Sequence, residues 1–138
     1  MKLGRVGLFA LLGMMSAVGP AMADGAQQFD LICHGNTTST AFFQSKPVFS
    51  EVPATKHLRI DLTTGQWCQD DCREVAHITD VTASQIVLTI AVGGQPLRTI
   101  DRRTGSYMEM VDTGGWGGDP FGGSCTPAPF TPFPTTKF

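Results

Sequence analysis

The chain has 138 residues, 41% of them hydrophobic, and a formal net charge of −2. This length suits one small domain. Its 10 basic and 12 acidic side chains include no basic cluster. The chain therefore lacks the concentrated positive charge with which proteins neutralise nucleic-acid phosphates or anionic lipids, and we expect no nucleic-acid partner.

The first 23 residues have the parts of a signal peptide. Lys2 and Arg5 supply a positive start, residues 6–18 form an apolar run, and residues 21–23, Ala-Met-Ala, provide a cleavage site. The apolar run is shorter than the roughly 20 residues needed to span a bilayer. We expect a periplasmic or secreted protein with no membrane anchor after signal cleavage. Removing residues 1–23 leaves 115 residues with eight basic and twelve acidic side chains.

All four cysteines follow the signal peptide, and an even number in an oxidising compartment favours disulfides. Three pairings are open. We favour Cys68–Cys72, which are close in sequence, together with Cys33–Cys125, which ties the first strand to the end of the chain. The alternatives are a redox-active Cys68–Cys72 pair, or a zinc site that includes His77. The disulfide interpretation predicts no metal and no cofactor.

Along the rest of the chain, apolar residues recur with a period of two, which is typical of strands. No helical stripe is present after the signal peptide. Short strands with short connections favour an all-β fold: a small antiparallel β-barrel or β-sandwich, stapled by disulfides and preceded by a signal-peptide helix. The predicted strands are 29–34, 41–49, 57–62, 66–68, 74–81, 86–92, 97–101 and 106–112.

Two segments 40 residues apart, 60–67 and 100–107, share the pattern I-D-x-x-T-G-x-aromatic. In a hairpin, such an aspartate accepts turn amides, the glycine adopts the left-handed conformation, and the aromatic covers the returning strand. A calcium or ligand loop built on Asp61 and Asp101 is the alternative, but one acidic residue per loop is too few for calcium. The pattern therefore predicts two similar hairpins.

The last 26 residues, 113–138, are rich in glycine and proline but also carry five aromatic side chains and Cys125. We expect a tail that packs on the β domain of residues 24–112. Trp116, set among glycines, is either an exposed binding residue or a lid on the core. Together with Trp67 it is our candidate for ligand contact at the mouth of the barrel.

Catalytic signatures are sparse. Residues 110–114 have the D-T-G form of an aspartic protease, but only 24 residues follow, and we interpret Asp112 as the end of a strand that enters a glycine loop. His34, His57 and His77 lie in predicted strands; if the first two share a face, they could act as a base or bind a metal. We assign no catalytic residue.

A resemblance rests on a frame that covers most of the chain after the signal peptide. The frame consists of Phe29-x-Leu31-x-Cys33-x-Gly35, Ile60-Asp61-Leu62, Trp67-Cys68 with Cys72, Ile100-Asp101-Arg102-x-Thr104-Gly105-x-Tyr107, and Gly123-x-Cys125. With it the chain resembles small exported proteins of alphaproteobacteria, a likeness that implies no function. The layout of Cys33 and Cys125 also resembles the periplasmic inhibitors of c-type lysozyme, which are small antiparallel β-barrels. The second cysteine pair and the long tail depart from that layout.

These observations favour a non-catalytic binding or interaction module, inhibitor-like in its architecture. Its partner would be a protein or a small ligand of the cell envelope whose identity the sequence does not give. A carrier that holds a small ligand in the barrel mouth is the first alternative. An enzyme based on Asp112 or the histidines is the second.

Overall fold

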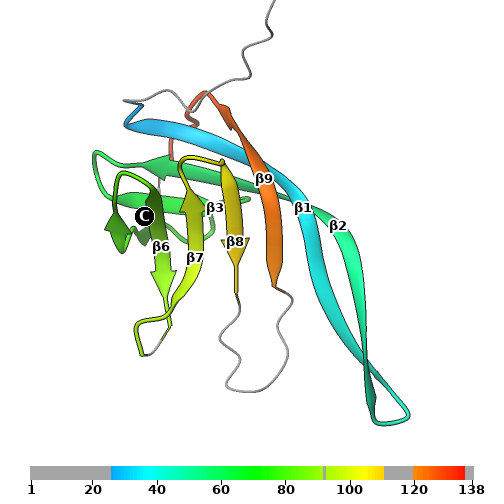
Figure 1. The fold of residues 1–138 in the computed structure, drawn as a ribbon. Coiled ribbons are helices and arrows are strands. Elements are labelled where there is room, and N and C mark those ends of the chain that lie inside the picture. Colours follow the sequence, from blue (N-terminus) through cyan, green and yellow to red (C-terminus); the bar gives the residue numbers. More distant parts are fainter. Residues whose placement is uncertain (1–25, 92, 111–119, 136–138) are drawn as a thin grey trace, which may run out of the picture.

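The computed structural model describes residues 26–91, 93–110 and 120–135, which form one nine-stranded antiparallel sheet. The order of strands in the sheet is β4-β3-β2-β1-β9-β8-β7-β6-β5. The sheet curls into a half-barrel (Figure 1), and the predicted all-β class is confirmed. The strands are β1 (Gln28–Phe43), β2 (Lys46–Asp61), β3 (Gln66–Gln69), β4 (Ala76–His77), β5 (Asp80–Val81), β6 (Gln85–Ile90), β7 (Pro96–Asp101), β8 (Ser106–Glu109) and β9 (Phe121–Ala128).

A two-residue link explains the curl. β4 and β5 lie at opposite ends of the strand order, yet only Ile78 and Thr79 separate them in the chain. The Ile78 N–H donates to the carbonyl of Gly65 at 2.8 Å, and the Thr79 N–H donates to the carbonyl of Val87 at 2.9 Å. Because so short a connection spans only about 10 Å, the two ends of the sheet must approach each other.

One face of the sheet supplies the core. Alternate residues are buried there in β1 (Leu31 and Cys33), β2 (Leu58 and Ile60) and β8 (Tyr107 and Glu109), as the period of two predicted. Burying each large apolar side chain contributes about 1.5–3 kcal/mol. The buried cluster consists of Leu31, Cys33, Leu58, Ile60, Trp67, Ile86, Leu88, Ile100, Tyr107 and Phe121.

Both hairpins predicted from the repeated pattern are present, as β2–β3 and β7–β8. The Asp61 Oδ1 atom accepts the backbone N–H groups two and three residues later, at 2.9 and 3.1 Å, and Asp101 Oδ1 accepts the equivalent groups at 2.8 and 3.0 Å. Gly65 and Gly105 have φ values of 66° and 70°, in the left-handed region. The aromatic residue two positions after each glycine is buried.

The β1–β2 hairpin extends well beyond the half-barrel. β9 pairs with β1 only as far as Thr37, and β3 pairs with β2 only from Leu58 onwards. Residues 38–51 form a two-stranded ribbon that projects from the sheet (Figure 1), and residues 52–57 of β2, which pair with residues 32–37 of β1, form its base. We call residues 38–57 the arm.

Four predicted strands are wrong in their extent. The predicted strands 29–34 and 57–62 cover only parts of β1 and β2. The predicted strand 41–49 crosses the tip of the arm, where Gln44 and Ser45 have φ values of 49° and 62°. Sequence reasoning missed this turn because neither residue is the glycine or asparagine that usually marks two successive left-handed positions. The predicted strand 74–81 is divided into β4 and β5 by the link that joins the sheet ends.

The expected tail contributes a strand. Within residues 113–138, the segment that forms β9 lies between β1 and β8 and not on the surface of the sheet. Cys33 and Cys125 are direct partners in the β1–β9 register and form a disulfide. A Cβ atom on Gly35 would collide with the backbone of β9, so the glycines here permit close approach of the two strands. The predicted signal peptide lies outside the described residues.

In the part of the chain that the structure describes, no helix is long and apolar enough to cross a membrane.

Candidate functional site

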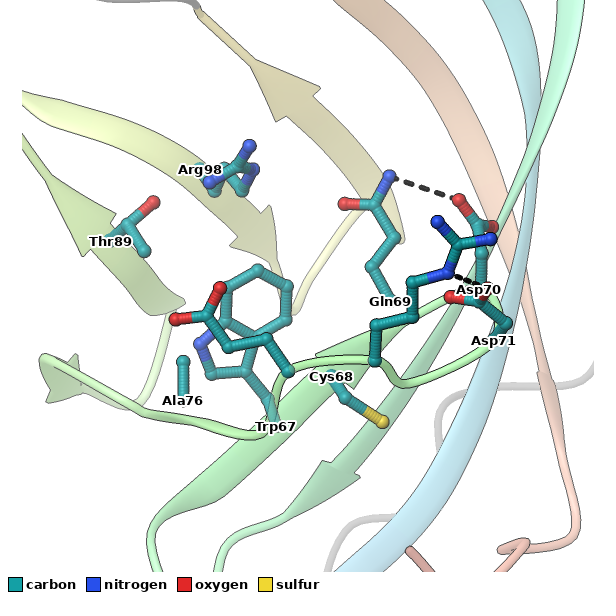
Figure 2. A pocket seen from close by; sticks show the side chains of 10 residues that line it. Trp67, Cys68, Gln69, Asp70, Asp71, Ala76, Thr89 and Arg98 are labelled. Carbon is teal, nitrogen blue, oxygen red and sulfur yellow. Dashed lines mark hydrogen bonds and ion pairs between the residues drawn. The ribbon is translucent and has the colours of Figure 1, made fainter. Parts of the chain in front are cut away.

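A cavity of about 380 Å³ lies between the two ends of the curled sheet. Trp67 of β3 borders it from one end of the strand order, and Thr89 of β6 and Arg98 of β7 border it from the other (Figure 2). Gln69 at the end of β3 and the loop of residues 70–74 that follows it form the rim. We call this site the Trp67 cavity. It exists only because the sheet curls.

Two polar groups in the cavity wall lack partners. The Trp67 side chain is 5% exposed, and its Nε1 atom is buried without a hydrogen bond to any described residue. The Thr89 Oγ1 atom is also buried without a hydrogen bond to any described residue. A buried donor without a partner costs about 1–3 kcal/mol. Both atoms have almost no accessible surface, so a ligand would satisfy them once the Trp67 and Thr89 side chains shift to open them to the cavity.

Arg98 is held by a charged network. It pairs across β7–β8 with Glu109, which is 7% exposed. The Arg98 Nε and Nη2 atoms lie 3.1 and 2.9 Å from Glu109 Oε1, and the guanidinium lies 5.8 Å from the centroid of the Trp67 ring. Lys56 Nζ is 3.8 Å from Glu109 Oε2, which also accepts the Tyr107 hydroxyl at 3.2 Å. Burial, followed by the Glu109 charge, raises the pKa of Tyr107, so the hydroxyl stays a neutral donor.

A short disulfide shapes the rim. Cys68 and Cys72 are joined and buried, as the spacing favoured, and Asp70 between them has a φ of 52°. The Asp70 carboxylate accepts the His57 backbone N–H at 3.0 Å, which fixes the loop to β2. With both disulfides formed, the described cysteines leave no free thiol. The two disulfides are consistent with an oxidising extracytoplasmic compartment.

The histidines do not form one site. His34 and His57 share the face of the β1–β2 hairpin away from the core, but each has its own partner. His34 Nδ1 contacts the Thr55 hydroxyl at 3.0 Å, and His57 Nε2 lies 2.9 Å from the buried carboxylate of Asp30. His77 is exposed on β4. Among the described residues no group of three or more histidine, cysteine, aspartate or glutamate side chains is arranged to hold a metal.

Of the two tryptophans that we selected, Trp67 lies in the cavity wall, whereas Trp116 lies outside the described residues, as does Asp112. Sequence reasoning missed Thr89, Arg98 and Glu109. For the last two a signal existed. Arg98 lies two residues before Ile100, and Glu109 lies two residues after Tyr107, so the period of two places both charged residues at core-facing positions of a predicted hairpin.

No family model, curated protein or solved structure matches the chain. Its function is therefore inferred from the residues that line the Trp67 cavity.

Proposed function

We propose that the protein is a non-catalytic binding module that holds a small polar ligand in the Trp67 cavity, in the periplasm or after secretion. The observation that supports this most is the pair of buried, unpartnered groups in one wall, Trp67 Nε1 and Thr89 Oγ1. An acceptor that enters the cavity gains hydrogen bonds without having to displace existing ones. The cavity volume of about 380 Å³ is within the range of small-molecule sites.

The lining favours binding over catalysis. Among the described residues, no serine, histidine or free cysteine borders the cavity, and the Thr89 hydroxyl forms no hydrogen bond to any of the lining carboxylates. Nucleophilic catalysis needs an activated nucleophile beside a base. The lining offers hydrogen-bond donors and fixed charges instead.

Tryptophan fluorescence tests the proposal. In a Trp116→Phe variant Trp67 is the remaining tryptophan and reports on the cavity alone. We expect at least one of four probes, benzoate, benzylamine, L-phenylalanine and glucose, to shift its emission at millimolar concentration. The response should weaken in the Trp116→Phe, Thr89→Val double variant, because one wall donor is lost.

The Trp67→Phe variant, in which Trp116 emits, is the control for effects outside the cavity. An emission spectrum of Trp67 that none of the four probes changes would contradict a small-ligand site in this cavity.

The arm supports a second candidate function, binding of a protein partner. It exposes four large apolar side chains: Phe43, Val48, Phe49 and Val52, at 69%, 49%, 67% and 49%. Phe43, Val48 and Val52 share one face of the β1–β2 hairpin, and Phe49 lies on the other. Exposed apolar side chains gathered on one face are typical of interaction surfaces. A hollow of about 410 Å³ lies at the base of the arm.

The outer edge of β2 in the arm is unsuited to strand addition. His57 directs its N–H and C=O toward β3, away from β1. Every second residue faces the same edge, which places Pro47 and Pro53 there without an N–H to donate. Prolines on an edge block the pairing of another strand. A protein partner would therefore contact the apolar side chains of the arm.

Photo-crosslinking tests the arm. A benzoylphenylalanine placed at position 48, on the face that carries Phe43 and Val52, should give a discrete adduct with one protein in exporting cells. The same group at Val81, which is 45% exposed on edge strand β5, is the matched control. Equal labelling from both positions, or no adduct from position 48, would count against a partner at the arm.

A further inference from the structure

A charged network behind one wall of the Trp67 cavity carries a surplus of positive charge. Arg98 lines the cavity, and behind it a single buried carboxylate, that of Glu109, pairs with both Arg98 and Lys56. Arg98 bonds Glu109 through Nε and Nη2, so Nη1 is the nitrogen left to meet a ligand. Trp67 Nε1 and Thr89 Oγ1 lie in the same wall without partners. A carboxylate, with two oxygens that accept up to four hydrogen bonds, suits this set of donors.

The rim of the cavity carries the opposite charge. Its acidic side chains are Asp70, Asp71 and Glu74, and its one cation, Arg73, pairs with Asp71 at 2.6 Å. Glu74 forms no salt bridge with any described residue. Figure 2 shows Asp70 and Asp71 across the cavity from Arg98. A ligand cation at the rim would therefore meet uncompensated carboxylates.

We propose that the Trp67 cavity binds a small zwitterion of the α-amino-acid type. The ligand carboxylate faces Arg98, Trp67 and Thr89, and the ligand ammonium group faces Asp70 and Glu74. This inference rests on the proposed function and names its ligand class.

A zwitterion fits both sides of the cavity better than a ligand of single charge does. A simple anion would meet Arg98 favourably but would lie close to the acidic rim. A simple cation would meet the rim favourably but would face Arg98. Like charges placed together across a binding site cost affinity, and opposite charges supply specificity. The volume of about 380 Å³ leaves room for a side chain.

Calorimetric titration of the protein with both disulfides intact tests the inference. The probes are L-alanine, L-leucine and L-phenylalanine, each as the free amino acid, the N-acetyl derivative and the amide. The N-acetyl form lacks the ammonium charge, and the amide lacks the carboxylate. We expect at least one free amino acid to bind about tenfold more tightly than either of its capped forms.

Two variants test which residue binds the ammonium group of the ligand and which binds its carboxylate. Glu74→Gln changes an exposed side chain without altering its shape, and it should weaken binding of the free amino acid about fivefold while leaving the N-acetyl form unchanged. Thr89→Val should weaken both forms, because both carry the carboxylate. Glu51→Gln, on the arm, is the matched control for loss of one surface charge and should change neither.

The outcomes separate the ligand class from the proposed function. Capped and free amino acids of equal affinity, or a Glu74→Gln variant that binds normally, would overturn the zwitterion while the cavity remains a ligand site. The zwitterion would also be overturned, with the cavity still a ligand site, if no amino acid binds while benzoate, benzylamine or glucose shifts Trp67 emission. If no probe binds by either measurement, both proposals fail.

Discussion

The Thr89 hydroxyl lowers the stability of the empty protein but, in our proposal, forms a hydrogen bond with the ligand. It is buried without a partner among the described residues, and replacing such a group by an apolar one of the same shape removes a desolvation cost. We expect Thr89→Val to raise the free energy of unfolding of the empty protein by about 1 kcal/mol. Urea titration followed by Trp67 fluorescence measures this.

Thr79→Val is the matched control for that variant. The Thr79 hydroxyl donates to the carbonyl of Leu88 at 3.2 Å, so its removal should lower stability or leave it unchanged. If Thr89→Val also destabilises the protein, the Thr89 hydroxyl has a partner in the fold and is not held for a ligand.

At the scale of single elements, the turn aspartates link stability to pH. Hydrogen bonds from the Thr104 and Arg103 amides hold the pKa of Asp101 below its ordinary value of 3.8. Burial raises the pKa of Asp61, but hydrogen bonds from Gln28 and the turn amides together bring it below 3.8 as well. A carboxylate whose pKa is lowered in the fold stabilises the protein above its unfolded pKa, and that contribution is lost as pH falls through the folded value.

An Asp101→Asn variant tests this link, because asparagine retains the acceptor oxygen of the turn but does not titrate. We expect it to be less stable than the wild type near neutral pH, with the difference shrinking as pH falls below about 4. Urea titrations across this range measure the trend. The Asp101→Ala variant also loses the acceptor and should remain destabilised at low pH. A stability difference for Asp101→Asn that does not change with pH would contradict the linkage.

The two hairpins also show which features of a turn a local sequence pattern predicts. Asp61, Gly65 and their counterparts in the second copy act within a few residues of the chain, so their roles could be predicted from sequence. The tip of the arm is local too, but Gln44 and Ser45 adopt left-handed backbone without the residues that favour it. A turn could be predicted from the sequence only where its residues are those that favour its backbone conformation.

At the scale of the whole molecule, the two disulfides differ in what they constrain. Cys33–Cys125 spans a sequence separation of 92 and joins β1 to β9, whereas Cys68–Cys72 spans four residues within the rim. By loop-closure entropy the long link contributes about 4–5 kcal/mol and the short one about 2 kcal/mol. The total stability of a domain this small is on the order of 5–15 kcal/mol.

We therefore expect the Cys33→Ala, Cys125→Ala double variant to lose most of its stability in urea titrations. The Cys68→Ala, Cys72→Ala double variant should remain folded and lose about 2 kcal/mol. Mass mapping under reducing and non-reducing conditions checks that the remaining disulfide forms in each. If the Cys68→Ala, Cys72→Ala variant loses more stability than the Cys33→Ala, Cys125→Ala variant, the β1–β9 pairing does not depend on its disulfide.

The sequence by itself determined the all-β class and the two repeated hairpins, and it favoured the pairing of the cysteines that the structure contains. The physical reason is that strand period, turn amides and cysteine spacing are set by neighbouring residues or by simple counting. Only the tertiary structure placed the Gly-rich end of the chain in the middle of the sheet, and only the curl brought Trp67, Thr89 and Arg98 around one cavity. Those placements depend on which distant strands pair and on how far the sheet turns, and both are settled by contacts between residues far apart in the chain.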